Sequence, residues 1–191
     1  MKTVNRKIIV AITGASGSIY ARLLLSCLSK LKDPPSEIAV VFSDTAQEVW
    51  EYETGSKYSP EFPAKEYDNN SFYAPFASGS SQYDTMIICP SSMGTIGRIA
   101  NGTSDNLIIR AADVILKERR KLIIVPRETP YNYIHLRNME TLTLAGAIIC
   151  PASPSFYSKP ATIDELIMTV VNRIIDLSGF ESEGYKWMEN D

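Results

Sequence analysis

The sequence contains a single histidine, and this scarcity excludes several kinds of chemistry. His135 lies in a stretch with helical spacing, and no cysteine or carboxylate flanks it at the spacing of metal ligands. A Ser-His-Asp hydrolase would have to use the same histidine, and the chain has no Gly-x-Ser-x-Gly elbow. We therefore predict a structural role for His135 and no metal site.

Cysteines, excess positive charge and long apolar runs are also scarce. Cys27, Cys89 and Cys150 are widely spaced in apolar surroundings, which favours buried thiols in a reducing compartment over a disulfide framework. A net charge of -3 with no stripe of Lys and Arg argues against nucleic-acid binding. No stretch is long enough to span a bilayer, and the apolar run near the start is too short for a signal peptide. We expect a cytoplasmic protein that acts on small molecules, with no nucleic-acid or membrane partner.

What the sequence does contain is an alternation of short apolar runs and helical patterns. With 191 residues, 45% of them hydrophobic, the chain has the size of a single domain, residues 1–191. Strands that alternate with helices predict a parallel sheet covered on both faces. The expected fold class is α/β, a three-layer α/β/α sandwich with a mostly parallel, Rossmann/flavodoxin-like sheet. The predicted strands span residues 7–12, 37–43, 85–90, 121–126 and 147–151.

Two segments do not follow this alternation. Residues 54–83 contain three prolines and many hydroxyls without a period, which predicts a long loop. Residues 179–191 form a mostly polar tail that carries Trp187, and its role is open. The helix before the fourth predicted strand is expected to be capped by Ser104 or Asp105 and to run to about Arg120.

The stretch around which the chain is organised is residues 7–18, an apolar run that ends in Thr13-Gly14-Ala15-Ser16-Gly17. It reads as a strand, a tight turn and the start of a helix. Such a turn leaves helix N–H groups free to hold a phosphate, and a plain turn without a ligand is equally compatible with the pattern. The spacing is neither the dinucleotide fingerprint nor a P-loop. The Tyr-x-x-x-Lys pair of short-chain dehydrogenases, which share this opening, is absent.

Further polar residues follow the other predicted strands, at the edge where the carboxyl ends of parallel strands meet. Ser43 follows the second strand, the turn Ser92 to Thr95 follows the third, and Arg127 and Glu128 follow the fourth. Lys117 shares a helix face with Arg110 and Asp113, and a solvated, ion-paired face explains it equally well. Hydroxyl turns beside cations fit a flat phosphorylated cofactor next to a second phosphorylated substrate.

Seven segments, in order between about residues 7 and 178, resemble the UbiX-type flavin prenyltransferases, formerly called phenylacrylic acid decarboxylases. The set is far more specific than one glycine turn. The segments are ITGASG (12–17), ASGSS (77–81), CPSSMGT (89–95), NLIIRAAD (106–113), LKERR (116–120), VPRETP (125–130) and PSFY (154–157).

The resemblance implies a single flavin-binding domain that transfers a dimethylallyl group from dimethylallyl monophosphate to N5 and C6 of reduced FMN, without a metal. The prenylated FMN would serve a UbiD-type decarboxylase. The resemblance also implies a homododecamer with sites at subunit junctions, so that the site residues need not all belong to one chain.

The resemblance also assigns roles to individual residues. FMN would be held by Gly14, Ala15, Ser16, Ser43, Ser92, Met93, Gly94, Thr95 and Arg127. The prenyl phosphate would be held by Lys117, Arg127, Glu128, Tyr157 and Arg173. The residues implied in catalysis are Ser16, Glu53, Lys117 and Glu128.

The sequence departs from the family at one wall and leaves two alternatives open. Phe72, followed by Tyr73, stands where the family often has Trp. A flavin-dependent cysteine decarboxylase of the related fold would need a histidine in the second strand–helix unit, and its Pro-Ala-Ser-Ala-Asn motif is replaced by Pro-Ala-Ser-Pro at 151–154. A non-catalytic FMN carrier would need the phosphate turns alone.

Overall fold

A computed structural model describes residues 6–60, 64–186 and 188. Six strands form one parallel sheet in the order β3-β2-β1-β4-β5-β6, which is the doubly wound order of Rossmann folds. Trp187 and the last residues of the predicted tail lie outside the described residues. The strands are β1 (Lys7–Ile12), β2 (Glu37–Phe42), β3 (Ala64–Tyr67), β4 (Tyr83–Ser91), β5 (Lys121–Pro126) and β6 (Ile148–Ile149).

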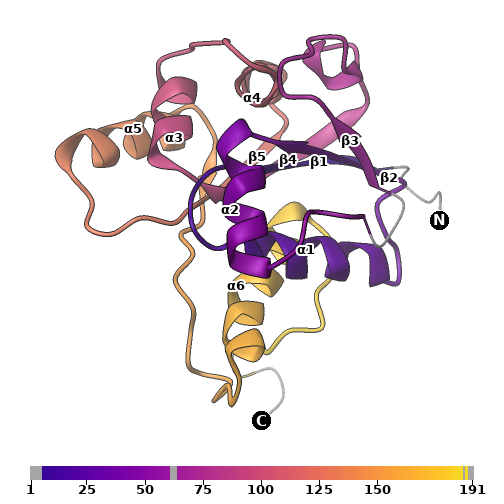
Figure 1. Cartoon of the computed structure of the whole chain (residues 1–191), viewed down its shortest axis with the longest axis vertical. Helices are drawn as coiled ribbons and strands as arrows, with labels where there is room; N and C mark the ends of the chain where they lie inside the picture. Colours follow the sequence, from indigo (N-terminus) through magenta and orange to yellow (C-terminus); the bar gives the residue numbers. More distant parts are fainter. Residues whose placement is uncertain (1–5, 61–63, 187, 189–191) are drawn as a thin grey trace.

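Helices cover both faces of the sheet, so the predicted three-layer sandwich is confirmed (Figure 1). One face carries α1 (Ser18–Lys30), α2 (Asp44–Thr54) and α6 (Ile163–Ser178), and the other carries α3 (Met93–Ala100), α4 (Leu107–Lys117) and α5 (Tyr133–Leu144).

The two apolar cores follow from the alternation of side chains along each strand. In β1, Ile8 and Val10 pack toward α1 and α6, whereas Ile9 and Ala11 pack toward α3 and α4. All four side chains are fully buried. Because both faces are covered, the strand is apolar at successive positions, which is the pattern that identified it in the sequence.

The predicted long loop, residues 54–83, is not without secondary structure. Its first residue closes α2, and it contains the edge strand β3, which pairs in parallel with β2, and a short 3₁₀ helix, Pro75–Ala77. The prediction missed β3 because an edge strand of four residues, half-exposed and preceded by two prolines in the sequence, lacks the apolar run of a central strand.

The helix before β5 differs from its prediction at both ends. Asn106, and neither Ser104 nor Asp105, caps α4, because its side-chain oxygen accepts the Ile109 N–H at 3.0 Å. The helix ends at Lys117, three residues before the predicted end. His135 forms a capping box with Asn132 at the start of α5, a structural role as predicted.

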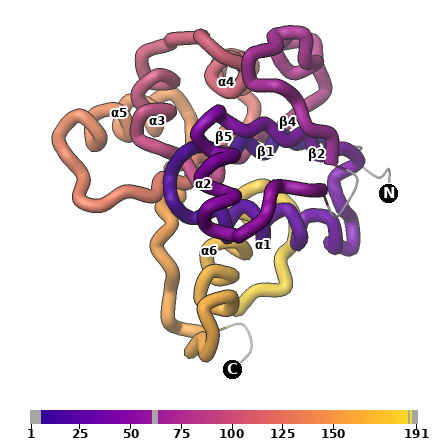
Figure 2. Tube along the Cα trace, in the orientation of Figure 1, coloured from indigo at the N-terminus to yellow at the C-terminus, as the bar shows by residue number. Residues whose placement is uncertain are grey.

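The segment after α6 turns back along that helix (Figure 2). Gly179 ends the helix with φ 83°, a left-handed conformation that glycine adopts at low cost. The Arg6 guanidinium lies 4.3 Å from the centre of the Phe180 ring, and the Ser182 N–H donates to Asp176 at 3.1 Å. None of the described helices is long and apolar enough to cross a membrane.

Candidate functional site

The loops that follow β1, β2, β4 and β5 meet at one edge of the sheet, since these strands are neighbours and parallel. Backbone hydrogen bonds connect the loops: Ser43 N–H donates to Ile12 O at 2.9 Å, and Arg127 N–H donates to Ser91 O at 3.3 Å. The predicted gathering of polar turns at the carboxyl edge is therefore confirmed.

The helix N-terminus predicted as a phosphate seat is held by a side chain of the protein itself. The Glu53 carboxylate, from the last turn of α2, accepts the Ser18 N–H at 2.7 Å and the Gly17 N–H at 3.0 and 3.1 Å. These are the first free amides of α1. The prediction that the α1 N-terminus can hold a phosphate is thus corrected: in this structure the anion at these amides is the Glu53 carboxylate.

Partial burial raises the pKa of Glu53, but hydrogen bonds from Ser16, Ser18 and Gly17 outweigh it and hold the pKa below its ordinary value. Glu53 is therefore a carboxylate at neutral pH. It joins two of the predicted site residues, since Ser16 is among its partners.

Arg127 ties the end of β5 to the same turn. Its Nε donates to the Ser16 carbonyl oxygen at 2.9 Å, which fixes the guanidinium while its two terminal nitrogens have no partner among the described residues. A fixed guanidinium with free donors is suited to a phosphate or a carboxylate.

The turn after β4 offers backbone donors. Ser92 caps α3, because its hydroxyl accepts the Thr95 N–H at 3.3 Å. Within the described part of the chain, no acceptor faces the N–H groups of Met93 and Gly94. Two open amides beside the Ser92 and Thr95 hydroxyls form a polar surface that a ligand can occupy.

The β1 turn and α2 are in close contact at Gly14. A Cβ atom added at Gly14 would overlap the Thr45 side chain, so only glycine fits here. Thr45 is in turn 3.4 Å from the Ser43 hydroxyl. Gly14, Ser16, Ser43, Glu53, the turn Ser92 to Thr95 and Arg127 thus lie in one connected region of this edge.

The remaining predicted residues on this side of the sheet are more dispersed. Glu128 follows Arg127, is exposed, and accepts its neighbour's Thr129 N–H at 3.0 Å. Arg173 lies near Cys150, which follows β6: burial raises the pKa of the Cys150 thiol and the Arg173 charge opposes this. Tyr157 lies between β6 and α6 and is 67% exposed.

Lys117 lies at the opposite edge of the sheet. It ends α4 just before β5 begins, whereas Arg127 follows the end of β5, and six strand residues span about 20 Å. The Lys117 ammonium pairs with Glu118 at 2.6 Å, with both side chains partly exposed. Within one chain, the structure does not bring Lys117 together with Arg127.

Two residues that the sequence reasoning did not select also lie at the carboxyl edge. Tyr20 is near Gly17 and Arg127; burial raises the pKa of its phenol, and the Arg127 charge counteracts this. Thr13 connects the β1 and β4 turns through its hydroxyl. Tyr20 lies in the first turn of α1 and Thr13 directly follows β1, so only the strand order could have related them to the turns after β4 and β5.

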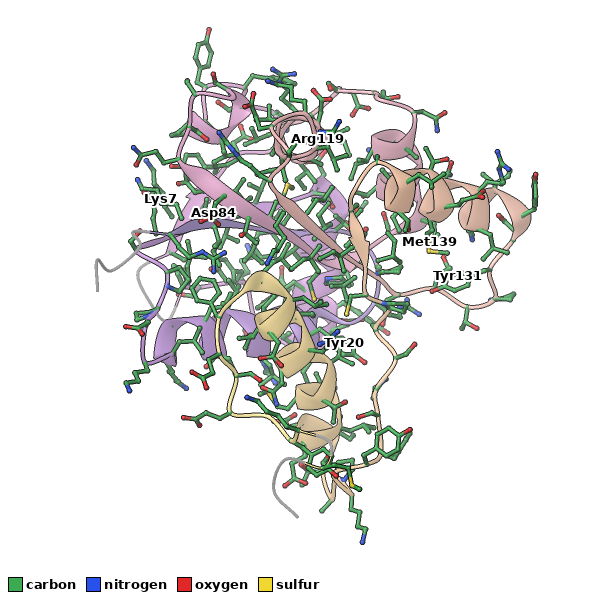
Figure 3. The ribbon with its side chains drawn as sticks, turned by 180° about the vertical axis from the view of Figure 1, so that it is seen from behind. Lys7, Tyr20, Asp84, Arg119, Tyr131 and Met139 are labelled. Carbon is green, nitrogen blue, oxygen red and sulfur yellow. The ribbon has the colours of Figure 1, made fainter. Side chains whose placement is uncertain are left out.

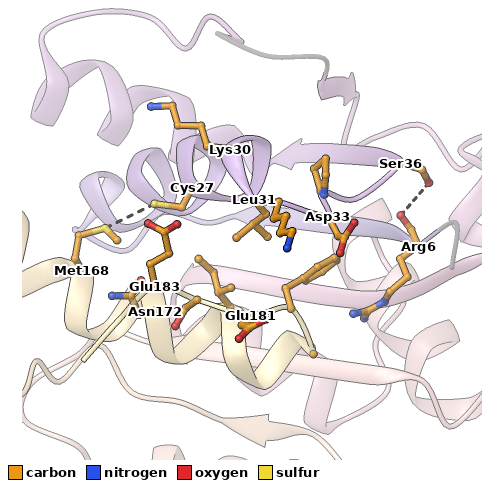
Figure 4. Close-up of a pocket in the computed structure, with 16 residues that line it drawn as sticks. Arg6, Cys27, Lys30, Leu31, Asp33, Ser36, Met168, Asn172, Glu181 and Glu183 are labelled. Atoms are coloured by element: carbon orange, nitrogen blue, oxygen red, sulfur yellow. Dashed lines mark hydrogen bonds between the residues drawn. The ribbon is translucent and has the colours of Figure 1, made fainter. Parts of the chain in front are cut away.

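A hollow of about 1220 Å³ lies elsewhere, between the end of α1, α6 and the segment after Gly179 (Figure 4). Cys27 and Met168 line it with their sulfur atoms 3.8 Å apart. None of the predicted site residues lines it, and its charged side chains have both signs. We locate the site at the carboxyl edge, because the open donors are there.

Comparisons with known proteins agree with this geometry. Residues 1–176 match the family model described as Flavoprotein. Flavin prenyltransferase UbiX of Methanocaldococcus jannaschii is 45% identical, over 94% of this chain and 97% of its own. A dodecameric FMN-dependent UbiX-like decarboxylase from Escherichia coli O157:H7 is 37% identical with a TM-score of 0.88, over 95% of this chain and 99% of its own.

A third protein, AnUbiX, has been solved in complex with FMN and dimethylallyl pyrophosphate. It is 40% identical with a TM-score of 0.85, over 96% of this chain and 99% of its own. The sheet order, the polar carboxyl edge and the family match together define a flavoprotein. Within that class, the chain belongs to the UbiX-type flavin prenyltransferase family.

Proposed function

We propose that this protein transfers a dimethylallyl group from dimethylallyl monophosphate to N5 and C6 of reduced FMN. The observation that carries the proposal is the cluster at the carboxyl edge, where the open amides of Met93 and Gly94 lie on the turn next to the fixed Arg127. The likeness to UbiX enzymes, one of them bound to FMN and dimethylallyl pyrophosphate, supports it.

The residues of this edge fit a flavin mononucleotide. Amides and hydroxyls of the turn Ser92 to Thr95, with Ser43, would hold its polar groups, and Gly14 and Ala15 would let its rings approach the backbone. Reduced FMN supplies the nucleophilic N5 and C6 atoms. Ser16 and Glu53 would lie beside that nucleophile, where the carboxylate can accept a proton.

The chain's cations would assist the departure of the prenyl phosphate. Breaking the allylic C–O bond leaves negative charge on the phosphate, and fixed cations in a water-poor site stabilise it. Arg127, Lys117 and Arg173 would supply that charge, Tyr157 a hydroxyl donor, and Glu128 an acid that protonates the leaving phosphate. Phe72 and Tyr73 would line the prenyl pocket, since aromatic faces stabilise an allylic cation.

We further propose that each site is completed by a second chain in a homododecamer. Within one chain the full length of β5, about 20 Å, separates Lys117 from Arg127, so both can contact one phosphate only if they come from different chains. Exposed apolar side chains of α5, including Tyr133, Ile134 and Leu144, offer a surface on which another copy could pack. The dodecameric structure of the Escherichia coli relative supports this assembly.

The product would be consumed in the cytoplasm by a UbiD-type decarboxylase. A cysteine decarboxylase is less favoured, because the second strand–helix unit holds Ser43 and Asp44 and no histidine. An FMN carrier would bind flavin through the same turns and leave it unchanged.

The test is to incubate the purified protein with reduced FMN and dimethylallyl monophosphate in the presence of EDTA. We expect a flavin that is heavier by one prenyl group in the mass spectrum. A matched reaction with dimethylallyl diphosphate identifies the preferred donor. Bound but unmodified FMN with both donors would contradict the proposal and favour the carrier.

A further inference from the structure

Thr13 is a buried polar residue at the carboxyl edge, 2% exposed, directly after β1. Its hydroxyl donates to the Pro90 carbonyl oxygen at 2.9 Å and accepts the Ser92 N–H at 2.7 Å. Its own N–H donates to the same Pro90 oxygen at 3.2 Å. The Thr13 hydroxyl thus makes both of these hydrogen bonds within the protein. It is therefore suited to orient the backbone of Pro90 and Ser92.

The Thr13 hydroxyl joins two turns that the proposed function uses. On one side Thr13 is adjacent in sequence to Gly14, and its carbonyl oxygen accepts the Ala15 N–H at 2.8 Å. On the other side it fixes the backbone N–H of Ser92, the residue whose side chain caps α3. The direction of the open amides of Met93 and Gly94 therefore depends on the hydrogen bond between Ser92 and Thr13.

We propose that Thr13 is a positioning residue for flavin binding: its hydroxyl holds the α3 N-terminus in register with the β1 turn. This inference rests on the proposed function, because it takes FMN as the ligand of these turns. Without the hydroxyl, the partly buried Ser92 N–H would lose its acceptor, and the start of α3 would shift toward another one.

Thr85 provides a matched control on the same sheet. It is also buried, at 1% exposed, and its hydroxyl also makes two hydrogen bonds, from Arg6 at 2.9 Å and to Asp84 at 2.6 Å. It lies near the start of β4, at the opposite edge of the sheet, whereas Thr13 contacts the end of β4. Thr13→Val and Thr85→Val therefore remove similar bonds at opposite edges.

The experiment measures the Kd for FMN by flavin fluorescence, and the Tm of each apoprotein. Thr13→Val should raise the Kd about tenfold, the usual effect of leaving a buried partner unsatisfied. Thr13→Ser keeps the hydroxyl and should stay within about twofold of the wild type, as should Thr85→Val even if its Tm falls.

A Thr13→Val protein that binds FMN as tightly as the wild type would overturn the inference, as would a Thr13→Ser protein that binds as weakly as Thr13→Val. If Thr13→Val does not fold, Thr13→Ser decides: an unchanged Kd supports the role, and a tenfold rise overturns it. A wild-type protein that binds no FMN would instead overturn the proposed function.

Discussion

The two edges of the sheet differ in how far their polar groups are paired. The amino edge is the one at which the parallel strands begin, opposite the carboxyl edge. At the amino edge, Arg6 bonds to Asp84 at 3.1 Å, Thr85 at 2.9 Å and the Ser178 carbonyl at 2.7 Å. Glu37 beside them accepts hydrogen bonds from Lys7 and Tyr83. Lys7 and Asp84 lie close together at this edge, on the far side of the molecule from Tyr131 (Figure 3).

The carboxyl edge leaves donors available. Arg127 is held by one nitrogen only, and the first amides of α3 have no acceptor among the described residues. Donors without a partner contribute less to stability than the paired groups of the amino edge. A bound ligand that accepts their hydrogen bonds can supply this stability. The comparison teaches that the Arg6 and Glu37 groups of the amino edge are paired within the chain, whereas the carboxyl edge keeps donors that a ligand can use.

The largest expected effect comes from replacing one arginine at each edge by alanine. Arg127→Ala should lower turnover at least 10²-fold, about the effect of losing one donor to a developing anion, with little change in Tm. Arg6→Ala removes bonds to a carboxylate, a hydroxyl and a carbonyl, and should lower the free energy of unfolding by about 2 kcal/mol while turnover per folded molecule is kept. Steady-state kinetics and thermal unfolding distinguish the two variants. If both variants lost turnover and stability to the same extent, the difference between the edges would be contradicted.

An intermediate effect tests whether the two edges belong to one site in the assembly. Lys117→Ala should bind FMN normally and lose turnover, because its charge would serve the prenyl phosphate of another chain's site. Mixing and reassembling it with Arg127→Ala should restore about a quarter of wild-type activity, since random pairing rebuilds one site in four. The control is each variant reassembled alone; a mixture no more active than these would assign both residues to one chain or neither to the site.

The smallest effect compares two carboxylates with lowered pKa values. Hydrogen bonds from Lys7 and Tyr83 lower the pKa of Glu37, as the α1 amides and Ser16 do for Glu53. A lowered folded pKa stabilises the protein above the ordinary carboxyl pKa, and this is lost as the pH falls through the folded pKa. Each Glu→Gln variant should therefore be less stable than the wild type at pH 7 and approach it in acid, and the loss should be smaller for the exposed Glu53, because solvent screens its interactions.

Only Glu53→Gln should also lose activity, because Glu37 is paired with Lys7 and Tyr83 and contacts none of the proposed site residues. Thermal unfolding from pH 7 down to pH 3, with turnover measured at pH 7, separates the two roles. If Glu37→Gln reduced turnover as strongly as Glu53→Gln, the division of labour between the edges would be wrong.

Central strands were predictable because their signals are local. The apolar run that became β1 is buried on both faces. The cap of α4 was predicted only to within one or two residues, because Ser104, Asp105 and Asn106 are all suitable caps. The edge strand β3 was missed, because Ala64–Tyr67 is stabilised mainly by pairing with β2, which no local pattern reveals.

The site was predictable to the level of the edge and no further. Residues that follow neighbouring parallel strands gather by topology, so Ser43, Ser92 and Arg127 could be grouped from the sequence. That Glu53 caps α1 could not be foreseen, because 36 residues separate it from Gly17. The distance between Lys117 and Arg127 depends on the direction in which α4 runs. The resemblance in sequence alone does not give that direction.

The contact between Gly14 and Thr45 has a consequence for the evolution of the family. A side chain at position 14 is tolerated only if position 45 becomes smaller or α2 moves away, so the two positions are expected to change together among homologues. Such paired substitutions in different lineages would show that the turn after β1 and α2 must stay in close contact.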